Sequence, residues 1–582
     1  MRKTKIICTI GPASESREII TRLVAQGMNV ARLNFSHGDH AEHKKRIDTV
    51  RQVAAELEQP LAIMLDTKGP EIRTGPLLEG KVVLQTGQRF VLTTRSVSGS
   101  AQEVSVSYPQ LPAEVKAGTS ILLADGLINL QVQETNSTDI ICQVINGGKL
   151  GEKKGVNVPG VRINLPFLSD KDIADLHFGI DQEVDFIAAS FVRNAEDVLD
   201  IRRILERGDA HIDIIAKIES QAGVDHLDDI IKVADGIMVA RGDLGVEIPM
   251  EEVPLVQKQI IEKCSQAGKV VIIATQMLDS MINNPRPTRA EVSDVANAIF
   301  EGADAIMLSG ESAVGKFPVE SVATMARIAK KIEQALPYPE ILRSKRLQGT
   351  ASVTDAISYA TCATAASLGI TSIITSTSTG STARRVAKYR PQADIFAVTA
   401  HTEIMNKLVL VWGVYPVLTG ETQGTDEMFE ESLNRCLEKG YVNQGDMVVL
   451  TAGSPAAFPG STNLLKVHVV GDILLQGMGI GSKPVSGMVR VILTDADVEK
   501  IQPGDIVVCH SAHKSVVPYL DRIQALIAEE GGLTSDAAIM GLTVGLPVIV
   551  GARNATNLLK DGMLVTVDTA HGRLYGGLAK VK

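Results

Sequence analysis

Short apolar segments in the first half of the chain are followed by polar side chains that could bind a metal ion or an anion. Lys217 and Glu219 stand two residues apart at the end of DIIAKIE, so on a strand their side chains face the same side. Asp243 follows the next apolar segment, GIMVAR. Two carboxylates with other positions open suit Mg²⁺, which keeps water or substrate oxygens as its remaining ligands. The alternative is an ion-pair network that seals one end of the fold.

Other apolar segments end in the same way. Each polar residue alone is compatible with an ion pair or a turn, but a structural role does not require polar residues after so many strands. The whole set at one rim therefore favours a functional site. The further members of the set are Arg32, Asn34, Ser36, Asp66, Thr67, Arg241, Thr275 and Gln276.

The elements that would position these residues are strand-length segments separated by amphipathic helical stretches. They read KIICTI, NVARLNF, LAIMLD, DFIAASF, DIIAKIE, GIMVAR, VVIIAT and AIMLSG. This alternation predicts an α/β fold of the (β/α)8 TIM barrel type, in which the chemistry lies at the carboxyl ends of the strands. An open α/β sheet is the alternative that the pattern leaves.

The segment between LAIMLD and DFIAASF has a different character. KVVLQTGQRFVLTT, EVSVS and TSILLADGLINLQVQ alternate apolar and polar residues with a period of two, between Gly and Asn turns. The pattern predicts a small β-barrel domain inserted after Asp66, which would cover the barrel mouth as a lid. We place the lid at residues 70–168 and the catalytic barrel at residues 1–69 and 169–345.

The remaining chain predicts two further α/β domains. A basic linker that contains Pro, LPYPEILRSKRLQG, precedes an open α/β regulatory domain that we place at residues 346–475. GDILLQGMGIGSKPVSG then indicates a glycine-rich linker, because GMGIGS has no strand before it and no helix after it. The final domain, residues 476–582, contains EEGGLTSDAAIMG, where Thr534 and Ser535 are placed to cap a helix whose first turn carries Asp536.

Composition excludes several classes of protein. The 582 residues carry a net charge of -10 without a long block of Lys or Arg, so nucleic acid is not an expected partner. The first apolar stretch ends at Gly11 and Pro12, which is too short for a signal sequence or a membrane span. Six cysteines without CxxC spacing indicate a reducing compartment, so we expect a cytoplasmic protein.

A nucleotide would have to bind through residues other than a Walker A loop. None of the Gly-Lys pairs in the chain is followed by Ser or Thr, as that motif requires. Basic residues near the barrel mouth or in the insert are the candidates: Arg32, His37, Arg73 and Lys154.

Long motifs give the chain a resemblance to a known family. They are TKIICTIGP, NVARLNFSHG, LDTKGPEIRTG, KKGVNVPG, IIAKIE, MVARGDLGVEI and ATQMLDSMINNPRPTRAEVSDVANAIFEGADAIMLSGE. In this order they resemble the pyruvate kinase family over residues 1 to about 475. The resemblance implies a barrel with an inserted β lid and a regulatory α/β domain. It also implies phosphoryl transfer from phosphoenolpyruvate to ADP, giving pyruvate and ATP in the last step of glycolysis.

The resemblance implies roles for the polar rim. Glu219 and Asp243 would hold Mg²⁺ or Mn²⁺, and Lys217 would offset charge on the transferring phosphoryl group. Arg32 would hold the phosphate. The ADP site is assigned by similarity to Arg32, His37, Arg73 and Lys154.

Further roles follow from the same resemblance. Backbone N–H groups around Gly242 and Asp243, with Thr275, would hold the substrate carboxylate, and Thr275 would lie near the carbon that is protonated. Glu71 in GPEIRTG is the residue type of potassium-dependent members, so we expect K⁺ dependence. The K⁺ ligands would be Asn34, Ser36, Asp66 and Thr67.

Other functions remain open on the residues alone. A Mg²⁺-dependent aldolase or lyase that forms a pyruvate enolate also needs Glu and Asp on a barrel rim, and an aldolase could use Lys217 as a Schiff base. Neither requires the lid or its basic residues. A phosphometabolite sensor on the same fold would be expected to lack Lys217, Glu219 or Asp243, and all three are present.

The second α/β domain contains a candidate effector site. TSTSTGSTAR, residues 375–384, is a hydroxyl-rich turn before a helix and suits a phosphate. The later loop TAGSPAAFPGSTN lacks the Arg, Lys or Trp that would bind a second phosphate, so we expect AMP or a sugar monophosphate as activator of a homotetramer. The alternative is a flexible polar loop. The candidate ligands are Thr377, Ser378, Thr379, Ser381 and Thr382.

Residues 476–582 resemble the swivelling phosphohistidine domain of phosphoenolpyruvate-utilising enzymes. In that family the turn is GGxTSHAAI and its His carries the phosphoryl group, whereas this chain has Asp536. An acidic residue at a helix start stabilises the helix but repels an incoming phosphate. The resemblance therefore implies a retained fold without carrier chemistry, serving stability or subunit contacts.

Overall fold

The computed structural model describes residues 1–161, 163–345, 352–453, 462–471, 473–481, 483–512 and 514–579. The chain forms two compact units, one of Met1–Ile341 with His401–Pro416 and one of Leu342–Ala400 with Val417–Lys582. Each unit is described by itself below. The division into four domains at the stated boundaries stays a prediction.

A closed barrel of parallel strands lies in the first unit. The predicted TIM barrel is therefore confirmed, and the alternative of an open sheet is excluded. The strands are buried apolar runs, as a sheet covered on both faces requires. Around the barrel they follow the order β1-β16-β15-β14-β13-β12-β3-β2. Their bounds are β1 (Lys5–Thr9), β2 (Val30–Asn34), β3 (Ala62–Asp66), β12 (Phe186–Ala189), β13 (Asp213–Ile218), β14 (Gly236–Ala240), β15 (Val270–Ala274) and β16 (Ala305–Leu308).

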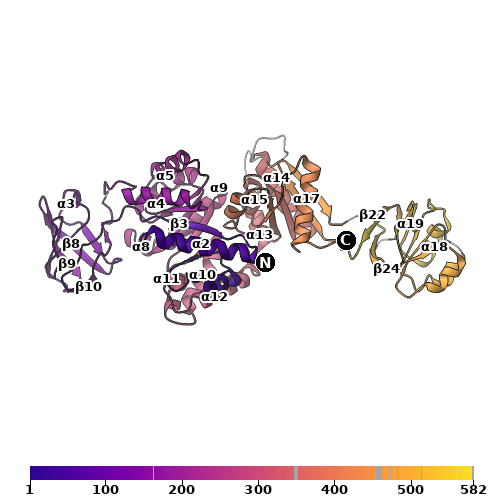
Figure 1. The fold of residues 1–582 in the computed structure, drawn as a ribbon, viewed down its shortest axis with the longest axis horizontal. Helices are drawn as coiled ribbons and strands as arrows, with labels where there is room; N and C mark the ends of the chain where they lie inside the picture. Colours follow the sequence, from indigo (N-terminus) through magenta and orange to yellow (C-terminus); the bar gives the residue numbers. More distant parts are fainter. Residues whose placement is uncertain are drawn as a thin grey trace. The chain divides into compact units, whose positions relative to one another are not determined.

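Helices surround these strands (Figure 1). Several begin at a Ser, Thr, Asp or Asn whose side chain accepts a backbone N–H of the first turn, which fixes where the chain enters the helix. The helices are α1 (Arg17–Gln26), α2 (His40–Leu57), α4 (Asp170–Asp181), α5 (Ala195–Arg207), α6 (Gln221–Asp225), α7 (Leu227–Val233), α8 (Arg241–Glu247), α9 (Val253–Ala267), η1 (Asp279–Ile282), α10 (Arg289–Glu301), α11 (Gly310–Ala313) and α12 (Pro318–Glu333).

The predicted insert leaves the barrel after β3 and returns before α4. It contains a six-stranded sheet of order β11-β7-β8-β9-β5-β6 and a two-stranded sheet of β10 and β4, with an apolar core of its own. Its elements are β4 (Lys81–Leu84), β5 (Arg89–Thr93), β6 (Glu103–Ser105), α3 (Leu111–Glu114), β7 (Ser120–Leu123), β8 (Ile128–Thr135), β9 (Asp139–Asn146), β10 (Gly148–Gly151) and β11 (Val156–Asn157).

Strand–helix alternation resumes after the barrel, as predicted. Parallel pairing joins β17 to β18 and β20, and β21 adds antiparallel to β20. The expected linker LPYPEILRSKRLQG contains a helix, α13. Its last residues, from 346 on, lie outside the described residues. The elements are α13 (Tyr338–Ser344), α14 (Val353–Leu368), β17 (Ser372–Ser376), α15 (Ser381–Ala387), β18 (Asp394–Thr399), α16 (Thr402–Leu408), β19 (Val414–Leu418), α17 (Thr425–Glu438), β20 (Met447–Ala452) and β21 (Leu464–Val469).

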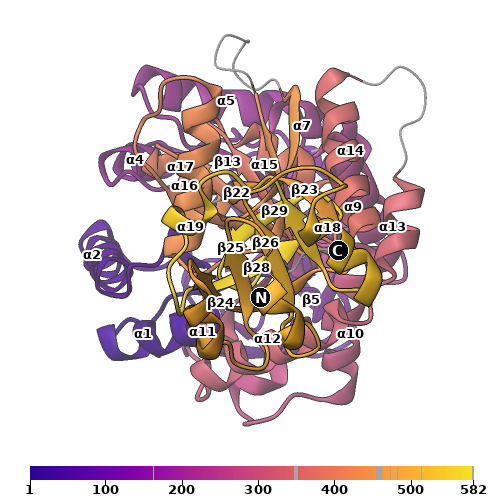
Figure 2. The same ribbon diagram turned by 90° about the vertical axis from the view of Figure 1, so that its right-hand side faces the viewer.

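The last part of the chain forms an eight-stranded sheet of order β22-β29-β28-β24-β25-β26-β27-β23. Figure 2 shows β24, β25, β26 and β28 side by side in yellow. The elements are β22 (Ile473–Gln476), β23 (Met478–Ile480), β24 (Val485–Ile492), η2 (Asp495–Lys500), β25 (Ile506–Cys509), η3 (Lys514–Tyr519), β26 (Ala525–Ala528), α18 (Asp536–Val544), β27 (Val548–Val550), α19 (Ala555–Leu558), β28 (Leu564–Asp568) and β29 (Arg573–Gly576).

The interpretation of GMGIGS as a linker is wrong. The segment forms β23, which pairs with β27, and β22 just before it pairs with β29. Its glycines allow close backbone contact: a Cβ on Gly477 would lie 2.5 Å from the Val550 carbonyl oxygen, and one on Gly479 would lie 1.8 Å from that of Thr569. Glycine is needed here for packing, and not for flexibility.

Candidate active site

Lys217 is the centre of a buried polar cluster at the carboxyl end of the barrel. Its Nζ lies 3.1 Å from Asp66 Oδ1, 3.1 Å from Glu219 Oε1 and 2.7 Å from Ser190 Oγ. Arg32 joins the cluster through its Nε, 2.7 Å from Asp66 Oδ2. These side chains stand on or directly after β2, β3, β12 and β13, so closure of the barrel brings them together.

Electrostatics in this cluster keeps Lys217 charged. Burial would lower the pKa of Lys217, but the carboxylates of Asp66 and Glu219 outweigh burial and raise that pKa above its ordinary value. Burial would raise the pKa of Asp66, and the nearby Arg32 and Lys217 reverse this effect and lower it. An ammonium held in this way is a poor nucleophile, so the cluster disfavours a Schiff base and suits stabilisation of an anion.

The buried carboxylate of Glu219 and the partly buried carboxylate of Asp243 form a pair that fits a divalent cation. Burial raises the pKa of Glu219 to about 7 although Lys217 opposes it, and the charge of Asp243 acts in the same direction as burial. Burial also raises the pKa of Asp243. A divalent cation would relieve this repulsion. The described residues contain no group of three or more His, Cys, Asp or Glu suited to a metal. Mg²⁺ bound by two carboxylates keeps water or substrate oxygens as its other ligands.

The start of α8 and the residues after β15 form a strained contact. A Cβ on Gly242, in the first turn of α8, would lie 2.8 Å from Thr275 Cγ2, so a larger residue here would displace the Thr275 side chain or the start of α8. Thr275 and Gln276 have φ values of 74° and 55°, which is costly for a β-branched residue. Arg241 holds the turn by donating to the Thr275 carbonyl at 2.9 Å and to Asp294 at 2.6 Å. Strain maintained in this way is typical of a substrate-binding position.

The residues predicted for K⁺ lie on two neighbouring strands. Asn34 and Asp66 are paired in register at the ends of β2 and β3. Asn34 Oδ1 accepts from the Ser36 N–H at 3.1 Å, and Thr67 Oγ1 accepts from the Ser190 N–H at 3.1 Å. The structure therefore brings one carboxylate and neutral oxygens to one place, and this donor set fits a weakly hydrated monovalent cation.

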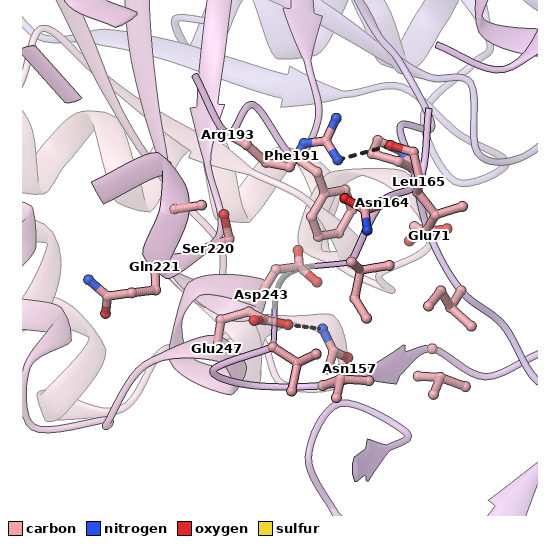
Figure 3. A pocket seen from close by; sticks show the side chains of 18 of the residues that line it. Glu71, Asn157, Asn164, Leu165, Phe191, Arg193, Ser220, Gln221, Asp243 and Glu247 are labelled. Atoms are coloured by element: carbon pink, nitrogen blue, oxygen red, sulfur yellow. Dashed lines mark hydrogen bonds between the residues drawn. The ribbon is translucent and has the colours of Figure 1, made fainter. Parts of the chain in front are cut away.

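A cavity of about 840 Å³ lies between the barrel and the insert. Asp243 lines it, and the insert contributes Arg73 and Lys154; Arg32 and His37 are not among its described lining residues. Figure 3 shows Asp243 and Glu247 facing Asn157, Asn164 and Glu71 across this space. The cavity thus brings together two of the four residues predicted for ADP.

Glu71 lines the same cavity and is bound to a basic residue. Its Oε2 lies 2.7 Å from Arg73 Nη2, and Arg73 also donates to the Lys153 carbonyl at 2.9 Å. The Glu71 carboxylate therefore fixes the guanidinium that the sequence assigns to the nucleotide. Its predicted influence on K⁺ stays a prediction.

Some residues of the site were missed by sequence reasoning. Ser190 directly follows β12 and contacts Lys217, and its only signal was its place at the end of a predicted strand. Asn157 Nδ2 donates to Glu247 Oε1 at 2.8 Å, and Arg193 donates to the Leu165 carbonyl at 3.0 Å (Figure 3). These two bonds join segments far apart in the chain, so no local pattern indicates them.

Comparisons with known proteins agree with this architecture. Residues 1–322 match the pyruvate kinase barrel domain, residues 355–468 the pyruvate kinase alpha/beta domain, and residues 501–572 the mobile domain of PEP-utilising enzymes. The chain is 52% identical to a pyruvate kinase of Geobacillus stearothermophilus and 52% identical to one of Bacillus licheniformis, each over 100% of both chains. A crystal structure of a pyruvate kinase from Cryptosporidium parvum superposes with a TM-score of 0.76 at 41% identity, covering 80% of this chain and 96% of that one. The chain belongs to the pyruvate kinase family.

Proposed function

We propose that this chain transfers the phosphoryl group of phosphoenolpyruvate to ADP through the residues of its barrel rim. The observation that carries the proposal is the cluster around Lys217, in which an ammonium held charged lies beside the carboxylate pair Glu219 and Asp243. Asp243 also lines the cavity that contains Arg73 and Lys154. Donor and acceptor sites would therefore meet at one rim.

The roles of the rim residues follow from charge and position. Lys217 and Arg32 offset negative charge on the phosphoryl group during transfer, and both are positioned before substrate arrives by their bonds to Asp66. Gly242 leaves space for the substrate carboxylate at the start of α8, and Thr275 lies near the carbon to be protonated through a water relay. Mg²⁺ or Mn²⁺ held by Glu219 and Asp243 would supply a Lewis acid for substrate oxygens.

Arg73 and Lys154 bind the phosphates of ADP in the cavity, and Arg32 and His37 are assigned to ADP by the family resemblance alone. Asn34, Ser36, Asp66 and Thr67 would hold K⁺, which would supply one further positive charge near the phosphoryl group. These assignments rest on the donor sets described above and on family membership.

A coupled assay tests the proposal. Pyruvate formation is measured with phosphoenolpyruvate, ADP and Mg²⁺, with KCl or with a non-binding cation at equal ionic strength. We expect turnover in KCl and a large decrease without K⁺. Absence of pyruvate in both conditions would show that the proposed function is wrong. Equal rates of pyruvate formation with and without K⁺ would refute only the proposed K⁺ site.

We further propose that TSTSTGSTAR binds the phosphate of AMP or a sugar monophosphate in a homotetramer. Thr377 Oγ1 accepts from the Gly380 N–H at 2.9 Å, and the buried Thr382 hydroxyl lies 2.9 Å from Thr462 Oγ1, so both hydroxyls serve the fold. Ser378 and Thr379 are exposed, and with the adjacent Ser381 they are the candidate phosphate ligands, although the Thr379 hydroxyl also accepts from the Ser381 N–H at 3.4 Å. Most of the loop TAGSPAAFPGSTN lies outside the described residues. Tighter activation by a bisphosphate than by monophosphates would contradict the proposal.

The C-terminal domain has a structural role in our proposal. Ser535 caps α18 as predicted, with its hydroxyl accepting from the Ala538 N–H, and Asp536 occupies the first turn. Phosphoryl transfer within the barrel requires no carrier. Among the described residues no helix is both long and apolar enough to cross a membrane.

A further inference from the structure

The turn that follows β2 is held both by the proposed cation site itself and by side chains outside it. This turn, residues 34–37, carries two of the predicted K⁺ ligands, Asn34 and Ser36. The Phe35 N–H donates to the Asp66 carbonyl at 3.0 Å, and the His37 carbonyl lies 2.9 Å from His43 Nε2. The Phe35 carbonyl accepts from Lys171 Nζ at 2.9 Å. Both the N–H and the carbonyl of Phe35 are therefore held by hydrogen bonds.

Lys171 is itself held in position by a buried carboxylate. Its Nζ lies 2.6 Å from Asp175 Oδ2, one turn further along α4, and 5.9 Å from the centre of the Phe35 ring. Asp175 is 1% exposed, and its other oxygen lies 2.8 Å from His40 Nε2. Lys171 remains half exposed, so replacing its side chain leaves the core of the barrel intact.

The first turn of α4 is a rigid anchor for this contact. Ser169 and Asp172 form a capping box, and Asp172 also accepts from the Gly69 N–H at 3.1 Å. Gly69 lies where the chain leaves the barrel for the insert, and Ser169 lies where it returns. The helix that holds the Phe35 carbonyl is thus fixed at both connections of the insert.

We propose that Lys171 is a positioning residue for the monovalent cation. It fixes the Phe35 carbonyl and so the peptide unit between Phe35 and Ser36, which sets where the oxygens of Asn34 and Ser36 lie. Lys171 contacts no substrate in this arrangement, and it acts through the turn. The inference rests on the K⁺ site of the proposed function.

The test compares Lys171→Met with the wild type over a range of KCl at constant ionic strength. We expect the K⁺ concentration for half-maximal activity to rise about three- to tenfold, less than the full worth of a charge-assisted hydrogen bond because Lys171 acts on the cation only through the turn. Turnover at saturating K⁺ should stay within about twofold. A second readout needs no turnover. In Mg²⁺ and phosphoenolpyruvate without ADP, K⁺ should raise the unfolding temperature of the variant less than that of the wild type.

Matched variants separate positioning from general damage. Lys171→Arg keeps a cationic donor and should recover most of the K⁺ affinity. Lys44→Met removes a Lys that is paired with Asp48 on α2 at 3.1 Å, and it should leave the K⁺ curve unchanged. Asp175→Asn leaves Lys171 in place but removes the carboxylate that holds it, and should shift the curve in the same direction by a smaller factor.

The outcomes distinguish the two proposals. If Lys171→Met and the wild type have the same K⁺ curves in both readouts, the inference is wrong and the K⁺ site stands. If the wild type does not respond to K⁺ in either readout, the K⁺ site and the inference are both wrong. If Lys171→Met loses turnover that neither saturating K⁺ nor the Arg variant restores, Lys171 has a structural role and the inference is overturned. Should the Met variant not fold, an unchanged K⁺ curve for Asp175→Asn overturns it.

Discussion

At the scale of single residues, Gly242 is a position where added volume should disturb the proposed substrate site. In Gly242→Ala the new Cβ would meet Thr275 Cγ2 at 2.8 Å. Because that clash displaces the start of α8, we expect at least a tenfold loss of kcat/KM for phosphoenolpyruvate, about 1.4 kcal/mol. Adding Thr275→Ser, which removes the methyl group and keeps the hydroxyl, should restore part of the loss in steady-state kinetics. Equal defects with and without the second change would refute the packing argument.

Glu71 offers a residue-scale test of the K⁺ requirement. Glu71→Lys introduces an ammonium near the proposed K⁺ position, so the variant should need less added K⁺ for activity. The change also breaks the ion pair with Arg73, which lies 2.7 Å away. Glu71→Gln is the control, since it breaks that pair without adding a cation and should keep the K⁺ requirement. A K⁺ activation curve for Glu71→Lys that matches the Gln control would contradict the prediction.

How much of the site could be predicted depends on where each residue stands. Arg32, Asp66, Lys217 and Glu219 follow apolar strands, so the pattern alone placed them at one rim, and the structure joins them by hydrogen bonds and ion pairs. Lys171 stands on the surface of α4, and its partners depend on how helices pack against the barrel. Such contacts have no sequence period and require the folded structure.

At the scale of elements, β12 begins beside a carboxyl group whose pKa is shifted. Asp185 Oδ2 accepts from the Ile63 N–H at 2.7 Å, and burial raises the pKa of Asp185 from 3.8 to about 6, although Arg51 and Lys407 oppose the shift. The folded protein therefore binds a proton more tightly than the unfolded chain. The resulting stability is complete below pH 3.8 and is lost as pH rises through 6.

Asp185→Asn tests this pH dependence. The amide mimics the protonated carboxyl group, so the variant should gain stability relative to the wild type between pH 5 and pH 8, by about 1 kcal/mol. Urea unfolding of both proteins at the two pH values measures the difference. A difference that does not change with pH, or that has the opposite sign, would show that Asp185 is ionised with an ordinary pKa in the folded barrel.

The strands of the barrel were predictable because a parallel sheet buried on both faces consists of apolar runs. The strands β22 and β23 were not, since the glycines within and around them give this segment the composition of a linker. Only the neighbouring carbonyl groups show that a side chain would not fit there. Local composition fails where backbone packing between distant segments decides the residue type.

At the scale of the whole molecule, the C-terminal domain should be dispensable for chemistry. A chain that ends at Gly471, before β22 begins at Ile473, should keep most of its turnover and lose thermal stability. Asp536→Asn in the full chain should leave turnover within about twofold, because the residue lies in a helix start and carries no phosphoryl group. Phosphorylated Asp536 detected by mass spectrometry during turnover would contradict this account, as would a folded Asn variant without activity.

The central claim is that Lys217 stabilises the transferring phosphoryl group, and Lys217→Met tests it most directly. Turnover is measured in the coupled assay, and phosphoenolpyruvate binding is measured by equilibrium titration in Mg²⁺ without ADP. Because the charge of Lys217 acts mainly on the group in transfer, turnover should fall by several orders of magnitude while the dissociation constant changes less than about tenfold. A folded Lys217→Met protein whose turnover falls less than about tenfold would contradict the claim and leave Lys217 with a structural role.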